Sequence, residues 1–217
     1  MREYLEFLRI FEKAALKAHR DIDEIEVIAV SKKKPASLIR DVIQNGYQSF
    51  GENQLQEVEN KWLGLKQEFD KTRLHFIGSI QSKKTEKIFE FCDVIHSIDR
   101  EKIVQKIKKC EDTFKIKKEY FIQINTGNEP QKSGVDYNES ENFIDKCLNQ
   151  YDLELKGLMC IPPQNANPEE HFIRLRDLGK NFNLPYLSMG MSEDFEVALK
   201  CGATHIRVGT KIFGARS

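Results

Sequence analysis

The chain has 217 residues, enough for one substantial core, and its 34 basic side chains balance 34 acidic ones. This balance removes the electrostatic argument for a nucleic-acid partner or an anionic membrane surface. No apolar stretch approaches the roughly 20 residues of a transmembrane helix, and the mixed charge at the start is unlike a signal peptide. The five cysteines are widely spaced and form no Cys-x-x-Cys pair, so we expect a reduced, cytoplasmic protein with neither a metal site nor disulfides.

Predicted strands and helices alternate along the whole chain. Residues 2–20 repeat apolar positions at helical spacing and predict an opening helix. Residues 27–30 form a β-branched apolar run, typical of a strand buried on both faces, and this strand must end before Pro35. We predict further strands at 48–50, 74–77, 94–98, 120–125, 153–159, 186–189 and 205–208. We predict helices near 38–43, 53–65, 82–91, 99–109, 139–149, 168–180 and 192–200.

The alternation predicts right-handed βαβ units and a parallel sheet. Eight predicted strands with seven helices between them, and the opening helix as the eighth, make a closed α/β barrel of the (β/α)8 or TIM type the expected fold. A doubly wound open sheet is the alternative, because strand counts from one sequence are easily wrong by one. No linker or shift of composition interrupts the chain, so we expect one domain over residues 1–217.

A basic run from Ser31 to Lys34 follows the first predicted strand, at the end of a barrel where active sites lie. One interpretation is a solvated loop, since lysines are mostly exposed. The other is that one lysine lies over the barrel mouth, where neighbouring cations and partial burial lower its pKa. Its amine can then form a Schiff base with a carbonyl group. Side-chain parity groups Lys32 with Lys34 and does not choose between them.

The loops after the last two predicted strands indicate an anion site, because barrel phosphate sites are often built there. Ser192 is placed as the N-cap of the helix at 192–200. Gly209 and Thr210 offer unobstructed backbone N–H groups and a hydroxyl. Taken singly, Ser192 is a routine cap and Gly209 a routine turn, so the prediction depends on their occurring together.

Three polar residues near other strand ends are ambiguous. A buried guanidinium is costly unless it is paired, so Arg207 either meets a carboxylate, the more frequent case, or faces a ligand in the mouth. His75 lies on an apolar strand, where a hydrogen-bonded core histidine is the usual finding. Asn53 is placed to cap the helix that follows it, in a capping-box-like start with Gln56, and so has a wholly structural explanation.

Seven short blocks, in order over nearly the whole chain, carry a family resemblance. The blocks are 29–35 (AVSKKKP), 50–57 (FGENxxQE), 75–81 (HFIGxxQ), 132–134 (KSG), 157–159 (GLM), 188–194 (SMGMSxD) and 207–214 (RVGTxIFG). Together they resemble the pyridoxal phosphate homeostasis protein family, also called the YggS/PROSC family. The resemblance implies a single (β/α)8 barrel like the N-terminal domain of alanine racemase, with pyridoxal 5′-phosphate (PLP) as its cofactor.

The resemblance also implies roles for individual residues. Lys32 matches the lysine that forms the internal aldimine with PLP. Arg207 matches the arginine at the pyridine nitrogen, which leaves that nitrogen unprotonated and weakens the cofactor as an electron sink. The remaining matches are Asn53, close to the ring, and Ser192, Gly209 and Thr210, at the phosphate. The chain departs from the family pattern at Lys33, usually a small hydroxyl residue, and at Lys83, usually Asn, and both changes add positive charge near the mouth.

We therefore predict a PLP homeostasis protein with little or no turnover and no catalytic residue. It would hold PLP and release it, or transfer it in transient contacts with PLP-dependent apoenzymes, as a monomer or weak dimer, and so buffer amino-acid and keto-acid pools. One alternative is a PLP-dependent racemase or lyase with a one-base mechanism, in which Lys32 is both anchor and base. Alanine racemase takes its second base from a further domain, whereas only 212–217 follow the predicted barrel. Another alternative is an aldolase or isomerase that forms a lysine Schiff base with a phosphosugar.

Overall fold

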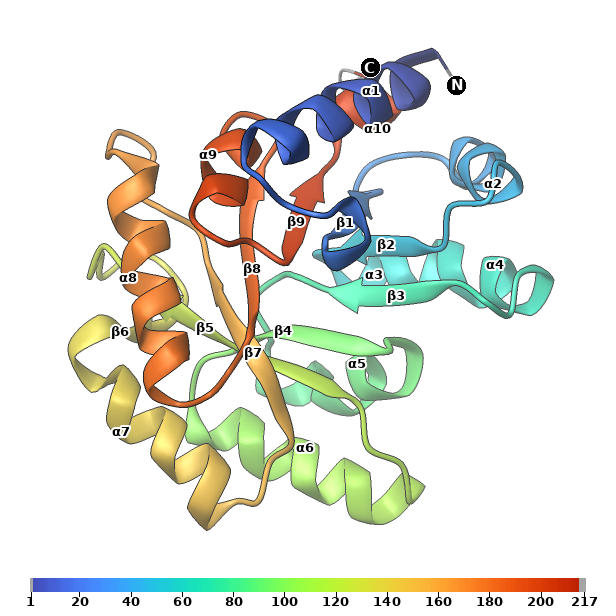
Figure 1. Ribbon diagram of the computed structural model, residues 1–217. Coiled ribbons are helices and arrows are strands. Elements are labelled where there is room, and N and C mark those ends of the chain that lie inside the picture. Colours follow the sequence, from blue (N-terminus) through green and yellow to red (C-terminus); the bar gives the residue numbers. More distant parts are fainter. Residues whose placement is uncertain (1, 215–217) are drawn as a thin grey trace.

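The computed structural model describes residues 2–214, and its strands close into a parallel ring (Figure 1). The ring consists of β1 (Glu26–Val30), β2 (Ser49–Glu52), β3 (Arg73–Phe76), β4 (Val94–Ile98), β5 (Glu119–Asn125), β7 (Leu155–Cys160), β8 (Tyr186–Met191) and β9 (His205–Val208). Its order is β4-β3-β2-β1-β9-β8-β7-β5, and β4 pairs with β5 to close it. The predicted closed eight-stranded barrel is thus confirmed, and the open-sheet alternative is wrong.

Helices surround the strands (Figure 1). They are α1 (Arg2–Lys17), α2 (Ala36–Gln44), α3 (Leu55–Glu57), α4 (Leu63–Glu68), α5 (Thr85–Phe91), α6 (Glu101–Phe114), α7 (Ser140–Asp145), α8 (Pro168–Asn181), α9 (Phe195–Lys200) and α10 (Thr210–Phe213). A π-helical turn, Val58–Trp62, joins α3 to α4, and a second, Lys146–Gln150, continues α7. Within residues 2–214 none of the helices is long and apolar enough to cross a membrane.

The opening helix α1 takes the eighth position of the helical ring, as predicted, because it packs against α9 and α10. Helix α8 shows how local sequence sets an element's bounds. The side chain of Asn167 accepts a hydrogen bond from the N–H of Glu169, Pro168 occupies the first helical turn, and Lys180 lies in the last turn. Each of these choices satisfies backbone groups or complements the helix dipole.

The structure differs from the prediction in one strand and several bounds. A short strand, β6 (Val135–Asp136), pairs with β5 on the edge that β4 leaves after Ile98. Two residues are too few to show any alternation, so the sequence carries no signal for this strand. Strand β2 extends two residues beyond the predicted end at residue 50, and α6 extends five residues beyond the predicted end at residue 109.

Side chains alternate between two environments along each strand. Those that point outward, such as Ala29 and Phe50, join the main apolar core beneath the helices. Val94, Phe121 and Met159 form a separate small cluster inside the barrel. His96 stacks on Phe121 in this interior, with ring centroids 4.3 Å apart. Barrel interiors are ordinarily filled by branched apolar side chains, so a buried histidine at this position is unusual.

Candidate functional site

Lys32 lies half-buried in a tight turn that follows β1. The carbonyl oxygen of Ser31 accepts a hydrogen bond from the N–H of Lys34 (3.1 Å), and Lys33 between them has a φ of 60°. The side chain of Glu57 accepts the N–H of Lys33 and anchors the turn to the next helix. The ammonium of Lys34 donates to the carbonyl oxygens of Phe213 and Gly214, at 3.2 and 3.0 Å. The ammonium of Lys34 therefore contacts the end of α10.

A buried ionic cluster around Lys61 contacts this turn through the carbonyl oxygen of Ser31 and the carboxylate of Glu57. The ammonium of Lys61 lies 2.6 Å from Oε1 of Glu52 and 2.8 Å from Oε2 of Glu57, and donates to the carbonyl oxygen of Ser31 at 2.9 Å. The hydroxyl of Ser31 and the indole N–H of Trp62 also donate to Glu52. Burial raises the pKa of Glu52, while Lys61 acts against that shift. The sequence analysis missed this cluster, because its members face the helix rather than the mouth.

Arg207 is a buried cation, with 4% of its surface exposed. Its Nη1 donates to the hydroxyl of Ser188 (2.7 Å) and its Nη2 to the carbonyl oxygen of Cys160 (2.8 Å). Among residues 2–214 no carboxylate forms an ion pair with it, so the structural ion pair that we considered the more frequent case is not found. Burial lowers the pKa of Arg207, with Cys160 and Asp194 acting in the opposite direction. Arg207 pairs in register with Ile28 of β1, one strand away from the Lys32 turn.

Asn53 is not a helix cap, so that structural explanation is wrong. Helix α3 begins at Leu55, and Gln54 occupies the cap position. The side-chain oxygen of Asn53 is buried, and no group in the described part of the chain hydrogen-bonds to it. Gly78, just after β3, passes so close that a Cβ there would lie 2.0 Å from the carbonyl oxygen of Asn53. A buried amide oxygen without a partner is costly and is consistent with a ligand at this position.

The predicted phosphate residues lie in the loops after β8 and β9. The sequence predicted Ser192 as the N-cap of α9, and this is wrong. The helix begins at Phe195, with Asp194 in the cap position. The carboxylate of Asp194 accepts the N–H of Met191 (2.6 Å) and shapes the loop that carries Ser192. Thr210 begins α10. No protein group between residues 2 and 214 hydrogen-bonds to the hydroxyls of Ser192 and Thr210.

The sheet order brings the predicted residues to one side of the mouth. Strands β8, β9, β1 and β2 are consecutive neighbours in the ring. The loops that follow them carry Ser192, then Gly209 and Thr210, then Lys32, then Asn53. Gly209 comes close to the β1 end, since a Cβ there would lie 3.1 Å from the carbonyl oxygen of Val30. Four adjacent strand ends thus present an amine, a guanidinium, an amide and two hydroxyls.

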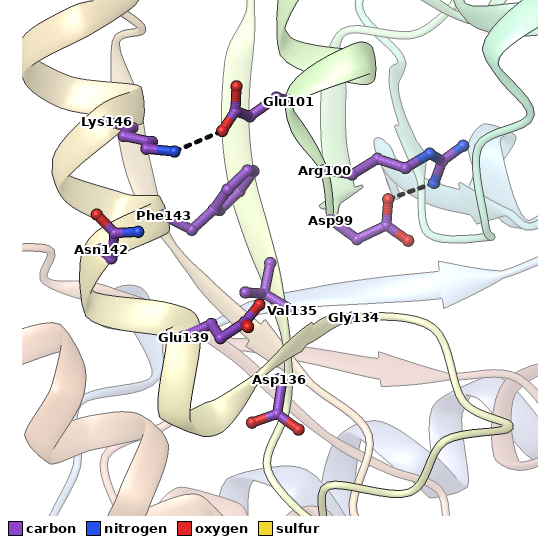
Figure 2. A pocket seen from close by; sticks show the side chains of 10 residues that line it. All are labelled: Asp99, Arg100, Glu101, Gly134, Val135, Asp136, Glu139, Asn142, Phe143 and Lys146. Carbon is purple, nitrogen blue, oxygen red and sulfur yellow. Dashed lines mark hydrogen bonds and ion pairs between the residues drawn. The ribbon is translucent and has the colours of Figure 1, made fainter.

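A separate hollow of about 350 Å³ lies between the start of α6, β6 and α7 (Figure 2). Figure 2 shows the ion pairs of Asp99 with Arg100 and of Glu101 with Lys146 on its walls. None of the residues predicted to bind PLP lines this hollow, namely Lys32, Asn53, Ser192, Arg207, Gly209 and Thr210. Four of the six charged residues on its walls pair with one another, whereas in the mouth Arg207 has no carboxylate partner within the described residues.

The support of Arg207 was also missed by the sequence analysis. Ser188 binds the guanidinium directly, and His96 in turn contacts the hydroxyl of Ser188 (2.9 Å). Both residues are fully buried on strands of the barrel. The sequence signal for both is a polar side chain in the middle of an otherwise apolar strand. His75 shows the same signal, and the sequence analysis predicts a hydrogen-bonded core histidine there. That interpretation is confirmed, because His75 is buried and both of its ring nitrogens have hydrogen-bonding partners.

The closed parallel barrel, with a lysine after its first strand, places the chain among proteins built on the alanine racemase N-terminal domain, and the model of that family matches residues 14–217. The pyridoxal phosphate homeostasis protein of Pseudomonas aeruginosa is 40% identical over 94% of this chain and 90% of its own length. That of Aquifex aeolicus is 36% identical over 96% of this chain and 95% of its own. The chain belongs to the pyridoxal phosphate homeostasis protein family, which confirms the resemblance seen in its motifs.

A solved structure of the same fold extends the comparison. PipY of Synechococcus elongatus, determined with PLP bound, superposes with a TM-score of 0.81 at 29% identity, over 93% of this chain and 97% of PipY.

Proposed function

We propose that this chain binds PLP at the mouth formed by β8, β9, β1 and β2 and serves intracellular PLP homeostasis. The amine of Lys32 adds to the aldehyde carbon of PLP, and a water molecule leaves as the Schiff base forms. Addition of water reverses the step and releases PLP with its aldehyde intact. The protein thereby holds a reactive aldehyde in a bound and recoverable form.

The buried guanidinium of Arg207, which has no carboxylate in direct contact within residues 2–214, is the observation that carries this proposal. An arginine only donates hydrogen bonds, so a ligand opposite it must offer an acceptor. An unprotonated pyridine nitrogen is such an acceptor, and Arg207 lies one strand from the turn that carries Lys32. The unpartnered amide oxygen of Asn53 fits a second polar atom of the ligand near the ring. Among relatives, PipY supports the proposal because it was determined with PLP bound.

The arrangement supports a carrier better than a catalyst. Many PLP enzymes that stabilise carbanions place an acidic residue at the pyridine nitrogen, where it keeps the ring protonated and strongly electron-withdrawing. An arginine cannot supply that proton. We therefore assign Arg207 a holding role and name no catalytic residue.

The proposal extends to the residues that bind the phosphate group of PLP, to the oligomeric state and partners of the protein, and to its cellular compartment. Ser192, Gly209 and Thr210 would bind the phosphate through their hydroxyl and backbone N–H groups. We further propose that residues 1–217 act as one PLP-binding domain, a monomer or weak dimer that meets PLP-dependent apoenzymes transiently. The five cysteines are free and buried, which supports a reduced cytoplasmic setting.

Visible absorption of the purified protein titrated with PLP tests the proposal. We expect a Schiff-base band in the wild type, no such band in Lys32→Ala, and a band of wild-type strength in Lys33→Asn. The last variant is a matched control, because it removes the neighbouring amine and Asn tolerates the positive φ at that position. A band that survives in Lys32→Ala, or fails to form in the wild type, contradicts the assignment. Rapid loss of the Cα hydrogen of alanine to deuterated solvent would instead favour the racemase alternative.

A further inference from the structure

Five side chains from five strands form one hydrogen-bonded column through the barrel interior. Nε2 of His75 lies 3.0 Å from Oε1 of Glu26, near the amino-terminal ends of the strands. Nδ1 of His75 lies 2.9 Å from Nε2 of His96. Nδ1 of His96 lies 2.9 Å from the hydroxyl of Ser188, which accepts Nη1 of Arg207 at 2.7 Å. The column therefore joins an anion at one end to a cation at the other.

The two ends fix the direction of every hydrogen bond between them. Arg207 can only donate, so the oxygen of Ser188 accepts from it and the hydroxyl proton is directed to Nδ1 of His96. A neutral His96 then carries its proton on Nε2 and donates to Nδ1 of His75. His75 in turn carries its proton on Nε2 and donates to the carboxylate of Glu26, which can only accept. The reverse polarity leaves the hydroxyl of Ser188 without an acceptor among residues 2–214 and turns the bare Nε2 of His75 toward the carboxylate of Glu26. The hydroxyl of Ser49 lies 3.0 Å from that nitrogen, but it already donates to Glu26 at the shorter distance of 2.7 Å.

The surroundings favour the charges that this polarity requires. Burial lowers the pKa of both His75 and His96 and outweighs Glu26, which acts to raise it. The neighbouring His205 and, for His96, Arg207 lower it further. Burial alone would raise the pKa of Glu26, but hydrogen bonds from His205 and His75 hold it well below the usual range. Both histidines are therefore neutral and Glu26 is ionised at neutral pH.

The other groups that face the Glu26 end come from β2, β3, β5 and β9. The hydroxyl of Ser49 donates to Glu26 (2.7 Å), and Nε2 of His205 lies 3.0 Å from its other oxygen. Arg73 pairs with Glu26 at 3.4 Å and with Glu119 at 2.9 Å. Among these groups, the carboxylates of Glu26 and Glu119 outnumber the single guanidinium of Arg73 by one negative charge, which complements the single charge of Arg207.

We propose that Glu26, His75, His96 and Ser188 are positioning residues for Arg207: a polarised relay that orients its guanidinium and supplies its counter-charge from the far end of the barrel. The inference deepens the proposed PLP site and rests on it for the identity of the ligand that Arg207 faces. Such a relay neutralises the cation without placing a carboxylate beside the pyridine nitrogen. A carboxylate there would compete for the guanidinium and, when protonated, would act as an acid toward the ring.

Nitrogen-15 NMR of the histidine rings in the full-length protein without PLP tests the polarity of the relay. We expect His75 and His96 to show only the neutral Nε2–H tautomer from pH 6.5 to 8. Glu26→Gln replaces a fixed acceptor by an amide that can also donate, so we expect mixed tautomers at His75 in that variant. Thr126→Val is the matched control, since it removes a buried hydroxyl–histidine contact, to His171 at 3.1 Å, outside the relay. An Nδ1–H tautomer, or titration of either ring in this pH range, overturns the proposed polarity.

PLP binding tests the positioning role. Loss of one hydrogen bond to a charged group predicts about tenfold weaker PLP binding in Ser188→Ala, with a shifted visible band. We expect Ser188→Thr, which restores the hydroxyl, to recover the band position, and Thr126→Val to leave affinity and band unchanged. Equal affinity and an equal band in Ser188→Ala and wild type overturn the positioning role. If the wild type takes up no PLP, the proposed function fails, whereas the histidine spectra still decide whether the relay exists.

Discussion

Replacement of Gly78 by alanine tests whether the close approach of the β3 end to Asn53 shapes the site. A Cβ at Gly78 would lie 2.0 Å from the carbonyl oxygen of Asn53, 2.6 Å from its carbonyl carbon and 2.7 Å from its Cα. These are backbone atoms, which cannot rotate away as a flexible side chain would. The β3 end and the Asn53 segment must therefore move apart in the variant.

The size of the effect follows from overpacking, which typically costs about 1–3 kcal/mol. A clash with backbone belongs at the upper end, so we expect a loss of about 3 kcal/mol, which lowers Tm by about 6–12 °C for a chain of this length. We also expect weaker PLP binding, because the amide of Asn53 is displaced with its backbone. Thermal unfolding followed by circular dichroism and a PLP titration measure the two effects.

Gly64 provides the control, since it is an exposed glycine within α4 where an added Cβ meets nothing within 4 Å. Alanine there should stabilise the protein by about 0.5–1 kcal/mol, because glycine is the poorer helix former. If Gly78→Ala melts within 1 °C of the wild type and binds PLP equally well, the close packing of Gly78 on Asn53 plays no part in the site.

Three further predictions concern the supports of the mouth. Lys61→Met leaves the buried Glu52 without its cation and should cost about 3–5 kcal/mol in urea unfolding, whereas an unchanged midpoint would show that the cluster contributes nothing. Lys34→Met removes the ammonium that binds the carbonyl oxygens at the end of α10, so hydrogen exchange of residues 209–214 should quicken, and equal exchange would contradict this role. The lowered pKa values of His75 and His96 mean that the unfolded chain binds protons first as the pH falls below 6.5. Stability should therefore decrease from pH 7 to 5, by as much as about 1.4 kcal/mol per pH unit for each histidine, and a flat profile would contradict their neutrality.

The barrel could be predicted because each strand and helix carries its own periodic pattern. Strands β4 (Val94–Ile98) and β9 (His205–Val208) have the predicted bounds, since each contains β-branched apolar residues and is flanked by polar residues or glycine. The closure of the sheet into a barrel was predicted from the number of strand–helix units, and no single unit indicates it. Strand β6 could not be found in this way, because a two-residue strand depends entirely on the edge of β5 that it pairs with.

The site was predicted less completely, because its support depends on contacts between distant segments. The caps assigned to Asn53 and Ser192 were wrong for a common reason: in both loops the chain makes a further turn before its helix begins, at Leu55 and Phe195. The partners of Arg207 lie 19 and 47 residues away in sequence, and no local pattern connects them to it. Polar residues at inward positions of the strands were the one signal available. Only the closed barrel brings these residues together in one interior, where they contact one another.

Reduction of the PLP-loaded protein with borohydride, followed by peptide mapping with fragment mass spectrometry, tests the central claim most directly. Reduction fixes the Schiff base as a stable secondary amine on the lysine that formed it. Fragmentation between the lysines at 32, 33 and 34 is required, because they are consecutive in the sequence and a peptide mass alone does not tell them apart. We predict the pyridoxyl group on Lys32 alone. Its presence on Lys33, Lys34 or a lysine elsewhere in the chain, with Lys32 unmodified, would contradict the site proposed at the barrel mouth.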